Sequence, residues 1–255
     1  MKRFLGLLYG IACYLFFLAV FLRAIWFVWS MDTLEPGSTL TRALLINAGL
    51  LSAFAIQHSG MARQGFKRAW AKIIPRPLER STYVFAASLV LLTVVQFWQP
   101  LPGVVWTVHN AMAVKLLQVF FWFGWALLFT CTVLIDHFDL FGLKQAWKYS
   151  RNEPYEPPAF RTPGPYRLVR HPLYLGFLIA FWSAPRMTSG HLFFAVMCTA
   201  YILVAIQLEE RDLVDFHGES YRLYRSGVSM LVPLPGKKPS QAARKAPIGS
   251  NLLRQ

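Results

Sequence analysis

The chain has 255 residues, of which 55% are hydrophobic and only 15% are charged, whereas a soluble domain carries about 25% charged residues. This deficit excludes a soluble globular protein and predicts an all-α integral membrane protein. The formal net charge of +14 lies mainly in loops between apolar segments, where it orients a membrane protein, so it does not indicate nucleic-acid binding.

Six apolar segments are candidates to cross the bilayer, whose hydrocarbon core takes about 20 helical residues. The first segment is longer than the hydrophobic part of a signal peptide and no cleavage site of small residues follows it, so we interpret it as a retained span. The fifth segment is short for a full crossing, which predicts a bundle of five to six transmembrane helices. The expected spans are residues 4–29, 40–56, 83–98, 111–135, 172–184 and 192–208.

The loops between these segments alternate in charge. Residues 59–81 carry six Lys or Arg and one Glu, whereas residues 31–39 carry acids without bases. The positive-inside rule then predicts both termini in the cytoplasm, as in a protein of the bacterial inner membrane. We expect residues 1–235 to form a single transmembrane domain, and residues 236–255, rich in Pro, Lys, Ala and Ser, to form a basic disordered tail.

Ionisable side chains gather at the ends of the segments that the charge pattern places in the cytoplasm. His58 ends the second segment and His137 follows the fourth. Ionisable groups at this depth indicate a functional site, although ordinary interfacial residues are the alternative. The cysteines, by contrast, lie within apolar segments, so neither a disulfide framework nor a metal site is expected. They are Cys13, Cys131 and Cys198.

The fifth and sixth segments are joined by a short turn and form a predicted antiparallel hairpin. The far ends of such a hairpin meet, so Arg170 and His171 should face Glu209 and Glu210, which follow the sixth segment. Pro172 suits the first position of a helix, and the next N–H groups are then free to stabilise a ligand carboxylate. These groups belong to Leu173, Tyr174 and Leu175.

The same hairpin offers contacts for other parts of a ligand. Tyr174 lies on the ligand-facing side of the helix that begins at Pro172. Gly176, which has no side chain, allows a flat group or another helix to approach closely. The paired glutamates would accept hydrogen bonds from an ammonium group or from ribose hydroxyls. The expected ligand is therefore a zwitterion that carries a sugar.

The motif Arg-His-Pro-x-Tyr-x-Gly at 170–176, followed by Glu-Glu at 209–210, resembles membrane-embedded S-adenosylmethionine-dependent methyltransferases. These include the isoprenylcysteine carboxyl and phospholipid methyltransferases. The flanking stretches GPYRLV and FHGESYRLYRSGV resemble the cofactor-binding half of that superfamily. In the first half, IQHSGMARQGFKRAW, ERSTYVF and DHFDLFGLKQAW resemble its NnrU-like branch and, within it, the methanethiol S-methyltransferases. The resemblance covers about residues 40–232.

The resemblance implies that the C-terminal hairpin forms a pocket for S-adenosylmethionine on the cytoplasmic side, without a Rossmann fold. The absence of a G-x-G-x-x-G motif agrees with this. The segment with Tyr221 and Tyr224 would then be a lid over the cofactor, although its spacing also suits an amphipathic helix on the membrane surface. The implied cofactor-binding residues are Tyr166, Leu168, Arg170, His171, Tyr174, Gly176, Glu209, Glu210 and Tyr221.

The implied reaction transfers a methyl group to a small volatile thiol, with methanethiol giving dimethyl sulfide. A thiol is a poor nucleophile until it becomes a thiolate. We therefore interpret His58 as a candidate base, and Arg80 or Arg63 as the charge that lowers the thiol pKa. His137, with Asp136 and Asp139, would orient such a base, and the candidate catalytic residues are His58, Arg80 and His137.

The sequence leaves three alternatives to methylation of a small thiol. One is the same chemistry on a prenylcysteine or a lipid. Another is a haem-binding NnrU-like redox protein or isomerase, with His58, His137 and His171 as ligands. A transporter or scaffold is disfavoured because no paired discontinuous helices are visible. The sequence identifies neither the oligomeric state nor the physiological thiol.

Overall fold

The computed structural model describes residues 1–35, 37–158 and 160–233. Five of its helices are long and apolar enough to cross a membrane, which confirms an all-α integral membrane protein. The predicted tail over residues 236–255 lies outside the described residues. The five helices are α1 (Lys2–Trp29), α2 (Leu40–Ala62), α4 (Arg76–Phe97), α5 (Ala111–Ile135) and α9 (Ser189–His217).

Two of these helices extend well past the predicted spans. Helix α4 begins at Arg76 rather than at residue 83, and α9 continues to His217 rather than ending at residue 208. Glu209 and Glu210, which follow the predicted sixth span, therefore lie within α9. Glu and Arg are good helix formers, so the helix continues after the apolar run has ended.

A sixth, shorter apolar helix, α8 (Pro172–Trp182), precedes α9. Its 11 residues span about 16 Å, well below the roughly 30 Å of a hydrocarbon core. Helix α8 packs closely on α5, where Gly176 meets Gly124. A Cβ added at Gly176 would lie 2.7 Å from the carbonyl oxygen of Gly124, so this glycine serves the approach of another helix.

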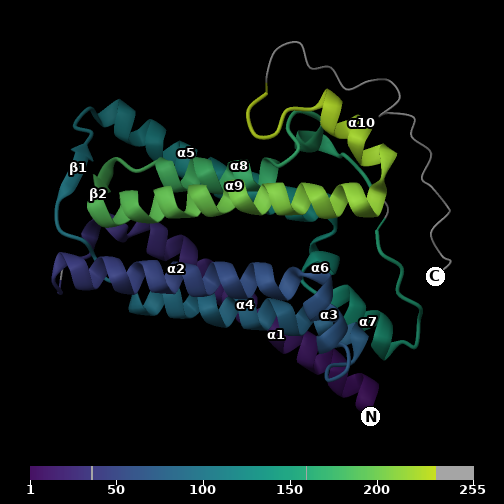
Figure 1. The fold of residues 1–255 in the computed structure, drawn as a ribbon. Helices are drawn as coiled ribbons and strands as arrows, with labels where there is room; N and C mark the ends of the chain where they lie inside the picture. The colour runs from purple at the N-terminus through teal and green to yellow at the C-terminus, as the bar shows by residue number, and fades with distance from the viewer. Residues whose placement is uncertain (36, 159, 234–255) are drawn as a thin grey trace.

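The long helices form two layers (Figure 1). Helices α5, α8 and α9 make one layer, and α1, α2 and α4 make the other. At one end the strands β1 (Val104–Thr107) and β2 (Arg186–Thr188) pair antiparallel, a feature that the sequence did not predict. An aromatic cluster joins the layers near this end and includes Phe27, Trp98 and Phe194.

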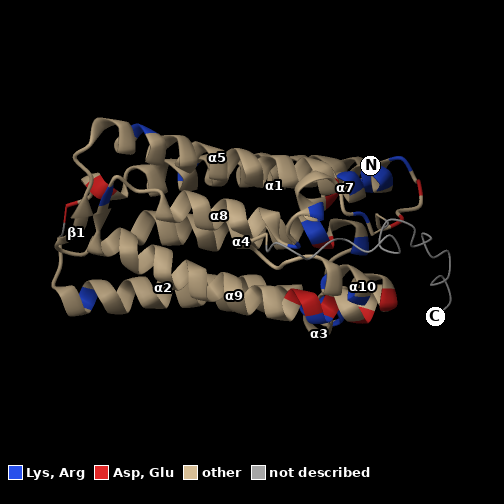
Figure 2. Ribbon diagram, turned by 90° about the horizontal axis from the view of Figure 1, so that it is seen from above, with Lys and Arg blue, Asp and Glu red and all other residues tan. Residues whose placement is uncertain are grey.

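The short helices gather at the opposite end together with the N-terminus (Figure 1). Figure 2 shows most of the charged residues at this same end and few in the middle of the bundle. This distribution of charge matches the prediction that basic loops alternate along the chain with loops that carry few bases. The short elements are η1 (Met31–Thr33), α3 (Gln64–Trp70), α6 (His137–Leu140), α7 (Leu143–Ser150), η2 (Gly164–Arg167) and α10 (Glu219–Gly227), of which η1 alone lies at the strand end.

Candidate functional site

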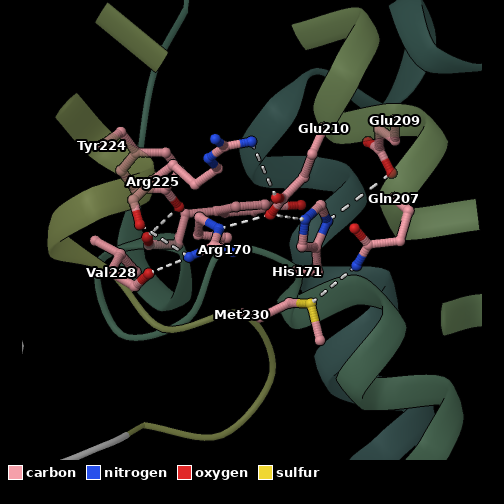
Figure 3. A network of polar contacts seen from close by, with 10 residues as sticks. Arg170, His171, Gln207, Glu209, Glu210, Tyr224, Arg225, Val228 and Met230 are labelled. Carbon is pink, nitrogen blue, oxygen red and sulfur yellow. Dashed lines mark hydrogen bonds and ion pairs between the residues drawn. The ribbon is translucent and has the colours of Figure 1, made fainter. Parts of the chain in front are cut away.

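A buried ion pair connects the start of α8 to α9, as the hairpin predicted (Figure 3). Nε of Arg170 donates to Oε1 of Glu210 at 2.7 Å, and Nε2 of His171 lies 3.1 Å from the same oxygen. Nδ1 of His171 also lies 3.8 Å from Glu209 Oε2. The carboxylate of Glu210 thus holds both residues that begin the hairpin.

The segment after α10 fixes the backbone of the same two residues. The N–H groups of Arg170 and His171 donate to the carbonyls of Ser229 (2.8 Å) and Met230 (3.1 Å). Nη1 of Arg170 donates to the carbonyls of Arg225 and Val228 (Figure 3). These contacts use Nε and Nη1 of the guanidinium on protein groups, so Arg170 shapes the wall of the cavity.

Helix α8 begins with Pro172 at its first position, as predicted. The prediction of three free N–H groups is wrong for Leu175, whose N–H donates to the carbonyl of His171 at 3.0 Å. His171 is the N-cap, and its carbonyl accepts the first bond of the helix. Among the described residues, the N–H groups of Leu173 and Tyr174 have no such acceptor, and they point out of the helix N-terminus.

A cavity of about 620 Å³ lies between the two helix layers, a volume typical of small-molecule sites. Leu168 is 67% exposed and does not line it. Gly176 packs on α5, and Glu210 lies behind Arg170 and His171. The predicted residues that line the cavity are His58, Arg80, His137, Tyr166, Arg170, His171, Tyr174, Glu209 and Tyr221.

Two buried polar atoms beside the cavity have no hydrogen-bond partner within the part of the chain that the structure describes. They are Oε2 of Glu209 and the hydroxyl of Tyr221, a residue that is only 1% exposed. Burial, with the negative charge of Glu210, raises the pKa of Tyr221, so its hydroxyl stays protonated and is a donor. An unpaired buried polar group costs about 1–3 kcal/mol, so this acceptor and this donor are suited to a ligand.

The wall on the other helix layer carries His58, Tyr83 and Arg80. The hydroxyl of Tyr83 lies 3.1 Å from each ring nitrogen of His58, and the ring of Phe54 stacks on the imidazole. Nε of Arg80 donates to the carbonyl of Leu140 at 2.7 Å, and its guanidinium lies 5.1 Å from the centre of the Tyr83 ring. Arg80 thus brings a positive charge next to the His58–Tyr83 pair.

His137 is held differently from His58. Its Nε2 lies 2.9 Å from the hydroxyl of Tyr14 and its Nδ1 lies 2.8 Å from Oγ1 of Thr132. Burial lowers the pKa of His137, which keeps the ring neutral. With both nitrogens engaged, His137 connects α1 to α5 at the edge of the cavity.

The two aspartates beside His137 do not reach His58. Asp136 caps α6 and forms an ion pair with Lys144. Burial acts to raise the pKa of Asp136, but the contact with Lys144 outweighs burial and lowers this pKa. Asp139 accepts from the hydroxyl of Tyr155 at 3.2 Å, and burial raises its pKa. The structure therefore brings neither of them to the imidazole that they were expected to orient.

Sequence reasoning missed the deeper lining of the cavity. Ala87, Ser88 and Leu91 line it, and they follow Arg80 on the same face of α4. The signal was their spacing of seven, eight and eleven residues after Arg80. This spacing alone did not indicate a cavity, because small and apolar residues are common throughout membrane spans.

Comparison with known proteins gives close relatives over most of the chain. The chain is 49% identical over 233 residues to the methanethiol S-methyltransferase of Pseudomonas sp. (strain GM41(2012)). This alignment covers 89% of the chain and 90% of the relative. It is 48% identical over 242 residues to the enzyme of the same name from Mycobacterium tuberculosis (strain ATCC 25618 / H37Rv), with 92% and 98% covered. Nurim of Xenopus laevis is more distant, at 29% over 175 residues, 66% of this chain and 61% of Nurim. No family model and no solved structure matches at a significant level.

Proposed function

Because this chain belongs to the methanethiol S-methyltransferase family, we propose that it transfers a methyl group from S-adenosylmethionine to methanethiol and forms dimethyl sulfide. The observation that carries the proposal is the arrangement of the cavity. One wall offers an acceptor on α9, Glu209, and a donor on α10, Tyr221, each with a buried oxygen that has no hydrogen-bond partner among the described residues. Its other wall carries a cation and an imidazole, Arg80 and His58.

The residues of the hairpin wall fit the polar groups of S-adenosylmethionine. The cofactor supplies a methyl group that is activated by the positive charge of its sulfonium. Glu209 would accept hydrogen bonds from the ammonium group or the ribose hydroxyls, and Tyr221 would donate one. The N–H groups of Leu173 and Tyr174, at the positive end of α8, favour the carboxylate.

Glu210, Arg170 and His171 have a positioning role in this proposal. Glu210 does not line the cavity, but it holds the two residues that set the start of α8. The position of that helix start determines where its N–H groups point. The network therefore orients the cofactor-binding wall.

The other wall activates the thiol. The positive charge of Arg80 stabilises a thiolate beside it, which lowers the thiol pKa. As the new sulfur–carbon bond forms, the thiol proton passes to a ring nitrogen of His58, and Tyr83 orients that ring. The reacting atoms must be held about 3–3.5 Å apart. Helices α2 and α4, which pack on each other, position His58 and Arg80 for this purpose.

We further propose that the end of the bundle with α3, α7 and α10 faces the cytoplasm of a bacterial inner membrane. The basic residues gathered there support this orientation (Figure 2). A cysteine-labelling experiment on intact cells tests it: a cysteine introduced in α10 should react only after the membrane is permeabilised.

The haem-binding alternative fits the site less well. Ligation of iron would require a free ring nitrogen on His58, His137 and His171. Both nitrogens of His137 are hydrogen bonded, so this ring has no nitrogen left for iron. An absorption spectrum of the purified protein should therefore show no Soret band.

Headspace gas chromatography tests the proposed reaction directly. Purified protein with S-adenosylmethionine and methanethiol should release dimethyl sulfide, and omission of S-adenosylmethionine should abolish the product. Cofactor binding without any volatile sulfide would contradict methanethiol as the substrate.

The cofactor wall is tested by calorimetry with two matched changes on α9. Glu209→Gln removes the charge that faces the cavity, and we expect the affinity for S-adenosylmethionine to fall about 10- to 100-fold. Asp212→Asn makes the same change at an exposed carboxylate that pairs with Arg63, and the affinity should not change. Equal affinities in the two variants would exclude Glu209 from the site.

A further inference from the structure

The cavity continues past its polar groups along one face of α4. Tyr83, Ala87, Ser88 and Leu91 all line it, and their spacing places them on a single helix face. From Tyr83 to Leu91 this face extends about 12 Å toward the middle of the bundle. Methanethiol, with one carbon and one sulfur, would leave most of this length unused.

We call this deeper part the inner compartment. Its walls come from four helices, and Trp125 packs behind two of its aromatic rings, with ring centres 5.5 Å from Phe21 and 5.7 Å from Phe177. The compartment therefore ends in the packed core of the bundle. Its lining residues are Phe21, Ala87, Ser88, Leu91, Leu128 and Phe177.

Two small side chains keep the inner compartment open. Ala87 and Ser88 line the cavity, and a larger side chain at either position would take up part of its volume. Ser88 is 4% exposed, so its small side chain is buried within the bundle. The lining is otherwise apolar, so the compartment suits an apolar group that enters from the polar end.

We propose that the inner compartment binds the alkyl chain of the thiol, so that the substrates include longer apolar thiols such as butanethiol. This inference rests on the proposed function. The sulfur lies beside His58, Tyr83 and Arg80, and the chain runs along Ala87 and Ser88 toward Leu91. The reaction is the same for every chain length: the thiol sulfur gains the methyl group that the sulfonium of the bound cofactor would supply, and His58 takes the thiol proton.

The first test measures kcat/KM for methanethiol, ethanethiol and butanethiol with the purified full chain, through the sulfides formed. Each methylene buried in an apolar site contributes about fourfold, so kcat/KM should rise with chain length. A fall from methanethiol to ethanethiol and again to butanethiol would overturn the inference.

Two substitutions at the inner compartment should change the butanethiol-to-methanethiol ratio of kcat/KM in opposite directions. Ala87→Leu fills the compartment and should lower the ratio about tenfold or more, whereas Leu91→Ala enlarges it and should raise the ratio severalfold. Leu89→Phe, on the exposed face of the same helix, should leave the ratio unchanged. Because a ratio is independent of the folded fraction, a constant ratio in both lining variants contradicts the inference.

A second measurement does not depend on activity. Ser88→Cys places a thiol in the inner compartment, and mass spectrometry then detects its reaction with methyl and butyl methanethiosulfonate. Both adducts are expected, and a methyl adduct without a butyl adduct would overturn the inference. A butyl adduct in a protein that methylates no thiol would refute the proposed function and leave an alkyl-binding compartment.

Discussion

The carboxylate of Glu210 lies 2.7 Å from Nε of Arg170, and both side chains are more than nine-tenths buried. Arg170 lies just before α8 and Glu210 lies within α9, 40 positions apart in the chain. A buried charge is stabilised by its partner, and removal of one member leaves the other unpaired in a medium that solvates it poorly. This contact therefore links the stability of the hairpin to the shape of the cavity wall.

Glu210→Ala should destabilise the protein strongly. The substitution leaves Arg170 buried without its carboxylate, which costs about 3–5 kcal/mol. Thermal unfolding in detergent should show a clear drop in Tm. Glu219→Ala removes an exposed carboxylate of α10 and should leave Tm within about 1 °C. Similar Tm values for the two variants would mean that the buried pair is not important for stability.

Gly176→Ala tests the contact between α5 and α8. The added Cβ would lie 2.7 Å from the Gly124 carbonyl oxygen and 3.0 Å from the Leu128 nitrogen, so the helices must separate. We expect a loss of about 1–3 kcal/mol in unfolding free energy. Gly49→Ala on α2 meets no atom within 4 Å and should stabilise by about 0.5–1 kcal/mol. Unfolding measured for both variants should give opposite signs.

The sequence predicted the features that depend on local composition. The apolar runs identified the spans, and the hairpin placed Arg170 and His171 opposite Glu210, because antiparallel helices with a short turn bring their far ends together. Helix ends were less predictable, since α9 continues into charged residues that hydropathy assigns to a loop.

The partners of individual side chains depend on packing between distant segments and could not be predicted. His137 looked equivalent to His58 in the sequence, but contacts with Tyr14 and Thr132 occupy both of its nitrogens. The pairing of β1 with β2 joins residues about 80 positions apart, and neither strand is long enough to give a pattern of its own.

Tyr221→Phe should have opposite effects on stability and on ligand binding. Since the hydroxyl has no partner among the described residues, its removal should leave the unliganded Tm unchanged or raise it. The affinity for S-adenosylmethionine should fall about 2- to 10-fold, because the ligand loses a hydrogen bond.

Tyr224→Phe is the matched control on the same helix. The hydroxyl of Tyr224 donates to the carbonyl of Tyr166 at 2.6 Å, so its removal should lower the unliganded Tm. Thermal shifts with and without S-adenosylmethionine measure both effects. An equal drop in the unliganded Tm of the two variants would show that the Tyr221 hydroxyl has a structural partner.

Arg80→Gln should change the pH dependence of the reaction. An alkyl thiol in water ionises with a pKa near or above that of a cysteine, about 8.5, and a neighbouring cation favours the thiolate. Without the Arg80 charge the pKa of the bound thiol rises, so less thiolate forms at neutral pH. We expect kcat to fall about tenfold or more at pH 7 and to recover toward the wild-type value as the pH rises above the shifted pKa. Arg76→Gln removes an exposed charge one turn earlier on α4 and should leave the profile unchanged. A loss of equal size at every pH would instead assign Arg80 a structural role, through the hydrogen bond that it donates to the carbonyl of Leu140.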